Sequence, residues 1–354
     1  MSSTEQLRRP APQRARAAQR PARGRERRPF VSIVVPTRNR ARFLPHLLEA
    51  LSRQRYPGDR AELIVVDDSS TDATQQVLAE WEPKLPFRCL FLRTEERSGQ
   101  AVARNLAVRR ASGTILAFTD SDCVPEPDWL ANGVAQVEAG AAVVCGPIDP
   151  QRLDGTHWLF SSNLNPVTSD TGLYPTANLF VRRAEFDAMG GFNEHVAAWG
   201  GVVAGEDTDL AWRIRRSGKL AIFAPTVRIV HLATPVSRKA WLIRPKILSI
   251  MPLLVRMIPE IRNVSLWHRY FISKQQFYFD VALAGLLAAA LTRWWPLTLA
   301  VLPWLYVVVR SHLVHAIRRR PEIVLPLFVL ITQQFFATFL VLLAASIRYR
   351  RLVL

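Results

Sequence analysis

The chain has 354 residues, of which 49% are hydrophobic and 24 are proline, so it is too long and too apolar for a disordered or disulfide-stapled mini-protein. Its formal net charge is +17, with nine Arg and two Glu in residues 1–28 and sixteen Lys and Arg against three acids in residues 238–354. The segment between these ends is slightly acidic. Because one basic end is also strongly apolar, we expect a membrane partner and no nucleic acid.

The two features that report on the cellular compartment are the cysteines and the N-terminus. The three cysteines show no CxxC spacing, so they indicate neither a disulfide framework nor a Cys-rich zinc site, and we expect a reducing compartment. Residues 1–29 contain almost nothing that could be buried, which predicts a disordered basic arm. No apolar stretch before Phe30 is typical of a secretory signal, so we do not expect export by that route.

From Phe30 onward, short apolar runs that end in polar turns alternate with stretches of helical spacing. The apolar runs are Val31–Pro36, Glu62–Val66 and Thr114–Thr119. The helical stretches are Arg42–Arg53, Thr71–Glu80 and Ala101–Ala111. This alternation predicts an α/β domain over residues 30–237 with a doubly wound, mainly parallel sheet, whose ligand lies beyond the carboxyl ends of the strands.

The remaining sequence predicts a membrane-associated region. Ile247–Pro259 is apolar but interrupted by Pro252 and Arg256, so residues 238–275 are expected to form an amphipathic interfacial segment. Residues 276–354 are expected to form transmembrane helices. The expected helices are Phe277–Thr292 and Trp294–Val309, as a tight hairpin or re-entrant pair hinged at Arg293 and Pro296, and the uncharged run Ile323–Ile347.

The positive-inside rule leaves the topology of these helices open. Three consecutive arginines, Arg318–Arg320, lie between the hairpin and the last apolar run, which favours the cytoplasm for that loop. Three spans would then leave the C-terminus outside. Arg348, Arg350 and Arg351 favour the inside instead.

Carboxylates follow two of the predicted strands. Asp120 and Asp122 form a D-x-D pattern after Thr114–Thr119, and such a pair can hold Mg²⁺ together with substrate phosphates, although Asp pairs are also common in turns. Asp67 and Asp68 end the second strand, where they are either helix caps or acceptors for a ribose or a base.

Basic and small residues accompany these carboxylates at the same edge of the sheet. The first strand ends at Pro36 and Arg38, and either Arg97 or Arg104 could balance phosphate charge beside the Gly99 turn. His231 ends a further apolar run and is either structural or an additional metal ligand. The predicted strand ends therefore converge on a nucleotide diphosphate site.

A second acidic group opens a later helix. Glu206 and Asp207 either cap this helix or, if Asp207 is aimed into the cleft, provide a general base. Gly191 and Trp199 precede them in a glycine-rich, aromatic stretch, where Trp199 is either core or a surface for stacking a sugar ring.

Six stretches resemble, in the same order, the motifs of family 2 glycosyltransferases of the GT-A type. They are Ser32–Asn39 (SIVVPTRN), Val65–Asp72 (VVDDSSTD), Gly99–Asn105 (GQAVARN), Thr119–Cys123 (TDSDC), Gly190–Glu194 (GGFNE) and Gly205–Leu210 (GEDTDL). The resemblance covers about residues 30–235. It implies an inverting transfer, in which an acceptor hydroxyl displaces a nucleoside diphosphate while a divalent metal, Mg²⁺ or Mn²⁺, stabilises the leaving group.

The resemblance also implies a role for each matching residue. Donor-nucleotide contacts fall to Pro36, Arg38, Asp67, Asp68, Arg97 and Asp120, metal binding to Asp122 with His231 as an added ligand, catalysis to Asp207 supported by Glu206, and acceptor binding to Trp199 and Gly191. UDP is the favoured nucleotide, because an Asp pair at the second strand commonly reads uracil in this family.

The expected activity is the addition of a single sugar, because the Q-x-x-R-W motif of processive synthases does not occur. The resemblance implies a bacterial inner (plasma) membrane enzyme with a cytoplasmic catalytic domain, which extends a lipid-linked or saccharide acceptor in exopolysaccharide or cell-wall glycan synthesis. The alternatives are a polyprenyl-phosphate glycosyltransferase that makes a lipid-linked monosaccharide and a non-catalytic membrane scaffold on a degenerate GT-A fold. A nucleotidyltransferase and a channel fit the sequence less well.

Overall fold

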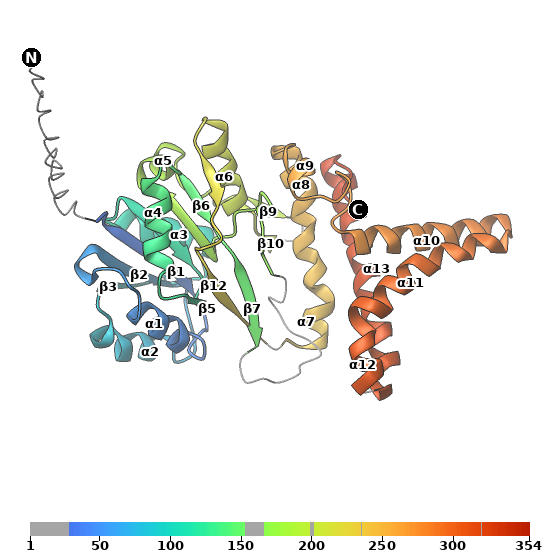
Figure 1. Ribbon diagram of the computed structural model, residues 1–354, viewed down its shortest axis with the longest axis horizontal. Helices are drawn as coiled ribbons and strands as arrows, with labels where there is room; N and C mark the ends of the chain where they lie inside the picture. The colour runs from blue at the N-terminus through green and yellow to red at the C-terminus, as the bar shows by residue number, and fades with distance from the viewer. Residues whose placement is uncertain (1–27, 153–165, 199–201, 235, 320) are drawn as a thin grey trace, which may run out of the picture.

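The computed structural model describes residues 28–152, 166–198, 202–234, 236–319 and 321–354. The chain forms an α/β domain, a layer of short helices beside it and a helical hairpin that projects away from both (Figure 1). The expected arm at residues 1–29 lies outside the described residues, apart from Arg28 and Pro29. The Tyr56 hydroxyl donates to the backbone carbonyl of Pro29 at 2.6 Å.

In the part of the α/β domain that the structure describes, there are twelve strands and six helices. The strands are β1 (Val31–Thr37), β2 (Ala61–Asp67), β3 (Arg88–Arg93), β4 (Ile115–Thr119), β5 (Cys123–Pro125), β6 (Val143–Cys145), β7 (Ile148–Arg152), β8 (Asn178–Arg182), β9 (Ala197–Ala198), β10 (Val202–Val203), β11 (Ala221–Phe223) and β12 (Ile229–Ala233). The helices are α1 (Leu44–Ser52), α2 (Thr74–Trp81), α3 (Gln100–Arg110), α4 (Trp129–Glu138), α5 (Arg183–Ala188) and α6 (Glu206–Arg216).

The main sheet confirms the predicted α/β architecture. Its seven strands lie in the order β11-β6-β8-β4-β1-β2-β3, and β1 to β4 are parallel, whereas β8 runs antiparallel between β4 and β6. A smaller sheet has the order β5-β12-β7 and begins directly after the loop that follows β4. The carboxyl ends of β1, β2 and β4 therefore meet at one edge, as predicted.

Alternate residues of the buried strands supply two separate cores, one on each face of the sheet. Ile33 and Val35 belong to the core beneath α1, α2 and α4, whereas Val34 belongs to the core beneath α3 and α6. The second core continues into the C-terminal region, because it also contains Leu254 of α8 and Leu342 of α13. The C-terminal helices are thus packed onto the α/β domain.

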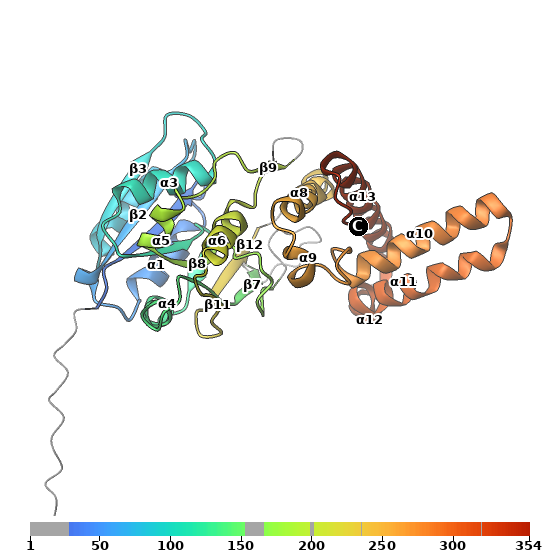
Figure 2. The same cartoon turned by 90° about the horizontal axis from the view of Figure 1, so that it is seen from above.

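Among the described residues after the α/β domain there are seven α-helices. They are α7 (Arg238–Ile243), α8 (Ile250–Met257), α9 (Ile261–Val264), α10 (Lys274–Thr292), α11 (Val301–Val308), α12 (Val314–Arg319) and α13 (Val324–Tyr349). A 3₁₀ segment, Arg244–Ser249, joins α7 to α8. Figure 2 shows the same arrangement from above, with α8 and α13 between the α/β domain and the α10–α11 hairpin.

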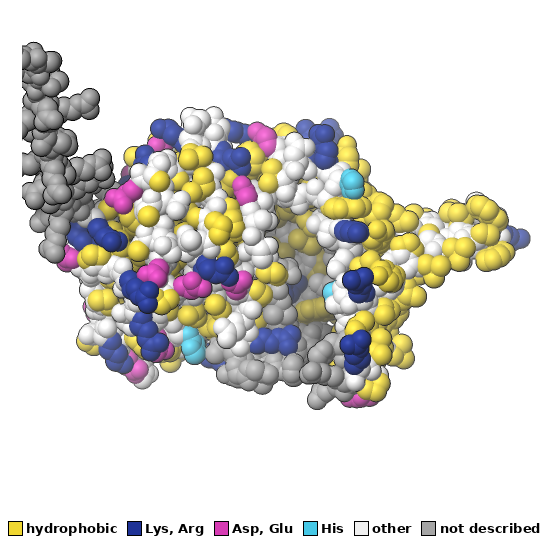
Figure 3. Space-filling view, viewed as in Figure 1, with side chains coloured by type: hydrophobic (Ala, Val, Ile, Leu, Met, Phe, Trp, Pro, Cys, Tyr) yellow, Lys and Arg dark blue, Asp and Glu magenta, His cyan; other side chains and the backbone are white. Residues whose placement is uncertain are grey.

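The hairpin expected from the sequence is present, and Arg293 at its turn adopts a left-handed conformation with φ of 59°. Among the described residues, two helical segments are long and apolar enough to cross a membrane, namely Trp295–Leu313 and Pro321–Tyr349. The first arm of the hairpin, α10, does not reach that threshold, although the sequence predicts three spans. On the face seen in Figure 3, hydrophobic side chains cover the hairpin almost continuously up to basic atoms at its tip.

Candidate active site

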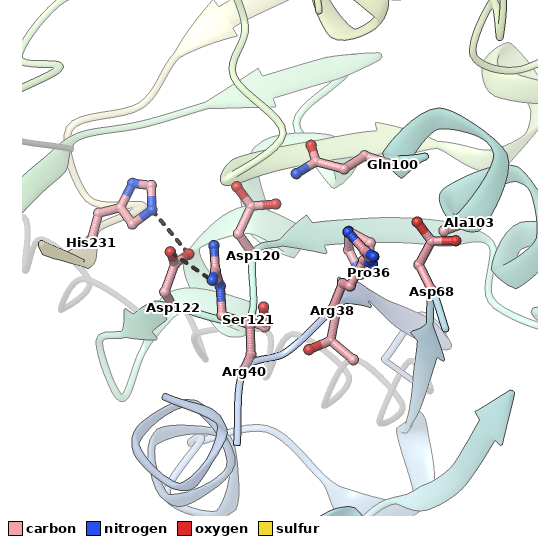
Figure 4. A pocket seen from close by; sticks show the side chains of 11 residues that line it. Pro36, Arg38, Arg40, Asp68, Gln100, Ala103, Asp120, Ser121, Asp122 and His231 are labelled. Atoms are coloured by element: carbon pink, nitrogen blue, oxygen red, sulfur yellow. Dashed lines mark hydrogen bonds and ion pairs between the residues drawn. The ribbon is translucent and has the colours of Figure 1, made fainter. Parts of the chain in front are cut away.

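A polar cavity of about 250 Å³ lies at the edge where β1, β2 and β4 end. Figure 4 shows side chains from these strand ends, from α3 and from β12 pointing into it. Its lining residues are Pro36, Thr37, Arg38, Arg40, Asp68, Gln100, Ala103, Asp120, Ser121, Asp122 and His231. We call it the strand-end cavity. The structure therefore brings six of the predicted site residues together here: Pro36, Arg38, Asp68, Asp120, Asp122 and His231.

Asp122 and His231 form a largely buried polar pair in the wall of the strand-end cavity. His231 Nε2 lies 3.0 Å from Asp122 Oδ1, and Arg40 Nε lies 3.8 Å from Asp122 Oδ2 (Figure 4). Burial alone would raise the pKa of Asp122, but the hydrogen bond from His231 and the positive charges of His231 and Arg40 outweigh it and lower the pKa. The carboxylate is therefore held in its charged form.

Asp122 and His231 also belong to a group of possible metal ligands. Their ligand atoms and the Cys123 thiol lie within 4.8 Å of one another. An ionised carboxylate beside an imidazole is a donor set that suits a divalent metal ion. Burial raises the pKa of the Cys123 thiol, which keeps the sulfur protonated and makes it a poor ligand. The residues present therefore fit the metal that the resemblance implies, with Asp122 and His231 as its protein ligands once the ion has displaced the proton from His231.

The two aspartates at the end of β2 have different environments. Asp68 lines the strand-end cavity and accepts hydrogen bonds from the backbone amides of Ser98 and Gly99, at 2.6 and 3.0 Å. Burial raises the pKa of Asp68, but these bonds, with those from the Ser98 and Thr94 hydroxyls, lower it overall. Asp68 thus holds the loop before α3 against the cavity.

Asp67 does not reach the strand-end cavity. It is fully buried, where it accepts a hydrogen bond from the Ser70 amide at 3.0 Å and another from the Gln75 side chain. These contacts stabilise the turn after β2, but Asp67 does not cap the following helix, because α2 begins at Thr74 with Ala73 at its N-cap. Arg97 is exposed on the loop before α3 and does not line the cavity either.

The sequence left open whether Arg97 or Arg104 balances phosphate charge, and in the structure neither lines the strand-end cavity. Arg104 pairs with two carboxylates instead. Its guanidinium donates to Asp120 Oδ1 at 2.9 Å and to Glu206 Oε1 at 2.8 Å. The loop after β4 and the start of α6 are therefore joined through one buried cation.

Asp207 lines a second cavity, of about 440 Å³, which we call the α6 cavity. Thr176 and Thr208 donate backbone hydrogen bonds to its two carboxylate oxygens, at 3.2 and 2.7 Å. Burial and the neighbouring Glu206 carboxylate raise the pKa of Asp207 to about 7, against the lowering effect of these bonds and of Arg104. A carboxylate with a raised pKa in a cavity has the properties of a general base.

The α6 cavity adjoins the strand-end cavity, because Gln100, Asp120 and His231 line both. Its far wall comes from the C-terminal layer, through Arg244 and Ile247. The local sequence carries no signal for these two residues, since they lie in a different part of the chain from every motif. The loop before Asp207 is also held by this layer: Gly205 has a φ of +88°, and a Cβ there would meet Leu254 of α8 at 3.1 Å.

Of the two predicted acceptor residues, Gly191 does not line either cavity. Gly191 lies in a separate hollow beside Asn105 and Phe186, which shares no lining residue with the other two cavities. Its φ is +78°, and a Cβ would meet Asn105 Oδ1 at 2.9 Å, so its glycine is explained by the turn. Trp199 lies outside the described residues.

Comparison with known proteins accounts for the motif pattern. Residues 32–199 match the family described as glycosyl transferase family 2. Glycosyltransferase AglE of Haloferax volcanii is 30% identical over 217 residues, which cover 58% of this chain and 68% of that protein. Validoxylamine A glucosyltransferase of Streptomyces hygroscopicus subsp. jinggangensis is 29% identical over 251 residues, and the match covers 60% of this chain but only 54% of that enzyme.

The solved structures agree on the fold. A mannosyltransferase from Pyrobaculum calidifontis, PcManGT, superposes with a TM-score of 0.53 at 21% identity, over 91% of this chain and 87% of that one. The match to the family and the similarity to AglE show that the chain belongs to glycosyltransferase family 2.

Proposed function

We propose that this protein is an inverting glycosyltransferase that transfers one sugar from a nucleotide-sugar donor to a hydroxyl of a lipid-linked acceptor. The observation that carries the proposal is the junction of the two cavities. The strand-end cavity is lined by Asp120, Asp122 and His231, and it adjoins the α6 cavity, which Asp207 lines and which shares Asp120 and His231. A donor and an acceptor can therefore meet at the shared residues.

The strand-end cavity suits the donor. Arg38 and Arg40 provide positive charge, Asp68 provides an acceptor for a base or a ribose, and Asp120 lies at the junction with the α6 cavity. A nucleotide sugar is also the ligand named for PcManGT, which was solved with GDP-Man and Mn²⁺. We favour a UDP-sugar because an acidic pair ends β2, of which Asp68 alone faces the cavity.

Asp122 and His231 are the residues that would hold a divalent metal ion. Bound there, the ion would supply positive charge to stabilise the leaving diphosphate. Arg40 forms an ion pair with the Asp122 carboxylate and adds a fixed positive charge at this wall of the cavity.

Asp207 is proposed as the general base. In the transfer, the acceptor hydroxyl loses its proton to the Asp207 carboxylate, its oxygen forms a bond to the anomeric carbon, and the bond from that carbon to the diphosphate breaks. The electron pair leaves with the nucleoside diphosphate, and the configuration at the anomeric carbon inverts. Glu206 is the positioning residue, because its charge raises the pKa of Asp207 and its carboxylate is fixed by Arg104.

The wall of the α6 cavity supports a lipid-linked acceptor. Arg244 is a cation positioned to meet a phosphate, and the neighbouring Ile247 is a large, exposed apolar side chain. Both belong to the basic and apolar layer that lies between the α/β domain and the projecting hairpin. An acceptor that joins a phosphate to a hydrocarbon chain matches both side chains. We place the enzyme at the inner membrane with its α/β domain in the cytoplasm, acting in exopolysaccharide or cell-wall glycan synthesis.

The test is the variant Asp207→Asn, measured both for sugar transfer and for nucleotide binding. Transfer should fall by at least about 100-fold, while the affinity for the nucleotide should change by no more than a few-fold, because the base acts on the acceptor. Asp187→Asn, an exposed aspartate of α5, is the matched control and should retain full activity. Retained transfer in Asp207→Asn, or equal loss of nucleotide binding, would refute the assignment of the base.

A further inference from the structure

We propose that the α10–α11 hairpin is the only part of the described chain that crosses the bilayer, and that α13 lies along the membrane surface on the side of the α/β domain. The C-terminus is then on the same side as the active site. This inference concerns the membrane topology and does not depend on the reaction.

The hairpin has the surface of a membrane-inserted element. From Val281 to Val309 its one charged residue is Arg293, at the turn. Large apolar side chains near the turn are exposed, including Leu291 at 76% and Trp295 at 72%. The two arms pack closely at Gly285, where a Cβ would lie 2.5 Å from that of Ala300, and such small-residue contacts are typical of helix pairs in membranes. An apolar surface of this extent requires an apolar partner.

The length of the hairpin matches a complete crossing. The second arm, Trp295–Leu313, is long and apolar enough to cross, and its 19 residues extend about 28 Å at 1.5 Å per residue, close to the hydrocarbon thickness of about 30 Å. The first arm, α10, has the same number of residues, and its charged residues Lys274 and Asp280 lie in the first two turns, at the end next to the α/β domain. An arginine at the bilayer centre costs at least about 2.5–3.5 kcal/mol, so Arg293 favours the opposite headgroup region over a position halfway across. Trp294 and Trp295 beside it are the aromatic residues that concentrate at membrane interfaces.

Helix α13 is long enough to cross the membrane, but its neighbours are not compatible with a crossing. It packs against α7, the 3₁₀ segment and α8, and Leu342 is fully buried in the core that contains Ile250 and Leu254 of α8. Five cations lie on that adjoining layer: Arg238, Lys239, Arg244, Lys246 and Arg256. If α13 crossed the bilayer, these cations would be carried into the hydrocarbon with it.

The C-terminus is held at the base of the hairpin. Leu354 accepts a hydrogen bond from the Ile272 amide at 2.6 Å and donates one to the Tyr270 carbonyl at 2.8 Å. Val353 is fully buried and exchanges hydrogen bonds with the Ser346 hydroxyl. Because α10 begins at Lys274, the chain ends on the membrane face from which the hairpin departs.

With three spans, the basic residues around Arg318 and those near the C-terminus would lie on opposite sides of the membrane, and the proposed topology removes this conflict. The second arm of the hairpin returns to the side of the α/β domain, so the basic residues around Arg318 and those at Arg348–Arg351 both lie on that side, as the positive-inside rule favours. It also places the α7–α8 layer, and with it Arg244 and Ile247 of the α6 cavity, at the membrane surface.

The test is the accessibility of single cysteines to a membrane-impermeant maleimide in sealed inverted and right-side-out vesicles. The parent protein for these variants carries Cys89→Ser, because Cys89 is partly exposed and would react. Cys123 and Cys145 are buried and are left in place. The reporters are the exposed positions Ala79→Cys on α2, Thr292→Cys at the hairpin turn and Arg351→Cys near the C-terminus. Thermal unfolding of each purified variant, compared with the parent protein, selects folded reporters, and labelling in detergent shows that each thiol reacts.

We expect Ala79→Cys and Arg351→Cys to be labelled from one side and Thr292→Cys from the other. Labelling of Arg351→Cys from the side opposite to Ala79→Cys would mean that α13 crosses the membrane, and the proposal would be wrong. Labelling of Thr292→Cys from the same side as Ala79→Cys, or from neither side in vesicles, would equally contradict it, because the turn would not reach the opposite surface.

Discussion

Arg104 Nη1 lies 2.8 Å from Glu206 Oε1, and the Arg104 side chain is only 1% exposed. The same guanidinium holds Asp120 from the loop after β4, so one cation joins that loop to the helix that carries Asp207, the proposed base. Breaking a buried ion pair by removing one partner costs about 3–5 kcal/mol, because the remaining charge stays buried without compensation.

We therefore expect Arg104→Met to lower the midpoint of thermal unfolding and to reduce transfer. The matched control is Arg110→Met, which removes an exposed cation from the end of the same helix. Both effects can be measured on detergent-solubilised protein. An Arg104→Met variant as stable as the control would show that this pair does not hold the two loops together.

The raised pKa of Asp207 predicts the pH dependence of the reaction. A base must be deprotonated, so the rate of transfer should fall as the pH decreases through about 7, whereas an ordinary aspartate would lose its activity near pH 4. The measurement is the pH profile of kcat/KM. A rate that stays constant from pH 8 down to pH 5 would exclude Asp207 as the titrating base.

The raised pKa of Asp207 also predicts how the stability of Asp207→Asn changes with pH. The folded state binds the Asp207 proton more tightly than the unfolded chain, so the ionised carboxylate destabilises the fold increasingly as the pH rises from about 4 to about 7. An amide removes this penalty. We therefore expect the midpoint of unfolding of Asp207→Asn minus that of the native protein to be larger at pH 8 than at pH 5. The same difference at both pH values would contradict a raised pKa of Asp207.

Metal binding should depend on His231. If Mn²⁺ binds the folded protein, it should raise the unfolding midpoint, by the equivalent of about 2.7 kcal/mol at a concentration of 100 times Kd. His231→Gln removes one of the two proposed ligands and should shift the Mn²⁺ titration to higher concentration by about 10-fold or more. His46→Gln, a histidine outside the strand-end cavity, should leave the titration unchanged.

Arg244 should determine the affinity for a phosphorylated acceptor. A hydrogen bond to a charged group contributes about 1.5–3 kcal/mol, so Arg244→Gln should raise the KM for a polyprenyl diphosphate-linked acceptor by about 10- to 100-fold, with little effect on the KM for the donor. Lys246→Gln tests an exposed cation of the same segment that does not line the cavity. Equal effects of the two variants would indicate only a general attraction to the membrane.

The donor side of the site was the part most accessible from the sequence. Parallel strands bring their carboxyl ends to one edge, so Pro36, Asp68 and Asp120 could be placed together without knowledge of the packing. Asp67 and Asp68 differ by one position, and successive residues point to opposite sides, so the structure was needed to show which of them faces the cavity.

The acceptor side was largely inaccessible from the sequence. Arg244 and Ile247 reach the α6 cavity because their segment folds back against the α/β domain, and no local pattern predicts such a contact. The order of the motifs predicts that Gly191 lies at the acceptor side, yet the turn that contains it lines a different hollow. The apolar run of α13 satisfied every criterion for a span, and only its packing against the basic α7–α8 layer indicates a different position.

We propose that the strand-end cavity binds a nucleotide-sugar donor together with a metal ion held by Asp122. Calorimetric titration of UDP, GDP and dTDP, with and without Mn²⁺, tests it most directly on the native protein, Asp122→Ala and the exposed control Asp59→Ala. We expect metal-dependent binding of one nucleotide, UDP, that is lost in Asp122→Ala and kept in Asp59→Ala. Binding that does not require metal and survives in Asp122→Ala, or no binding of any nucleotide to folded protein, would contradict the claim.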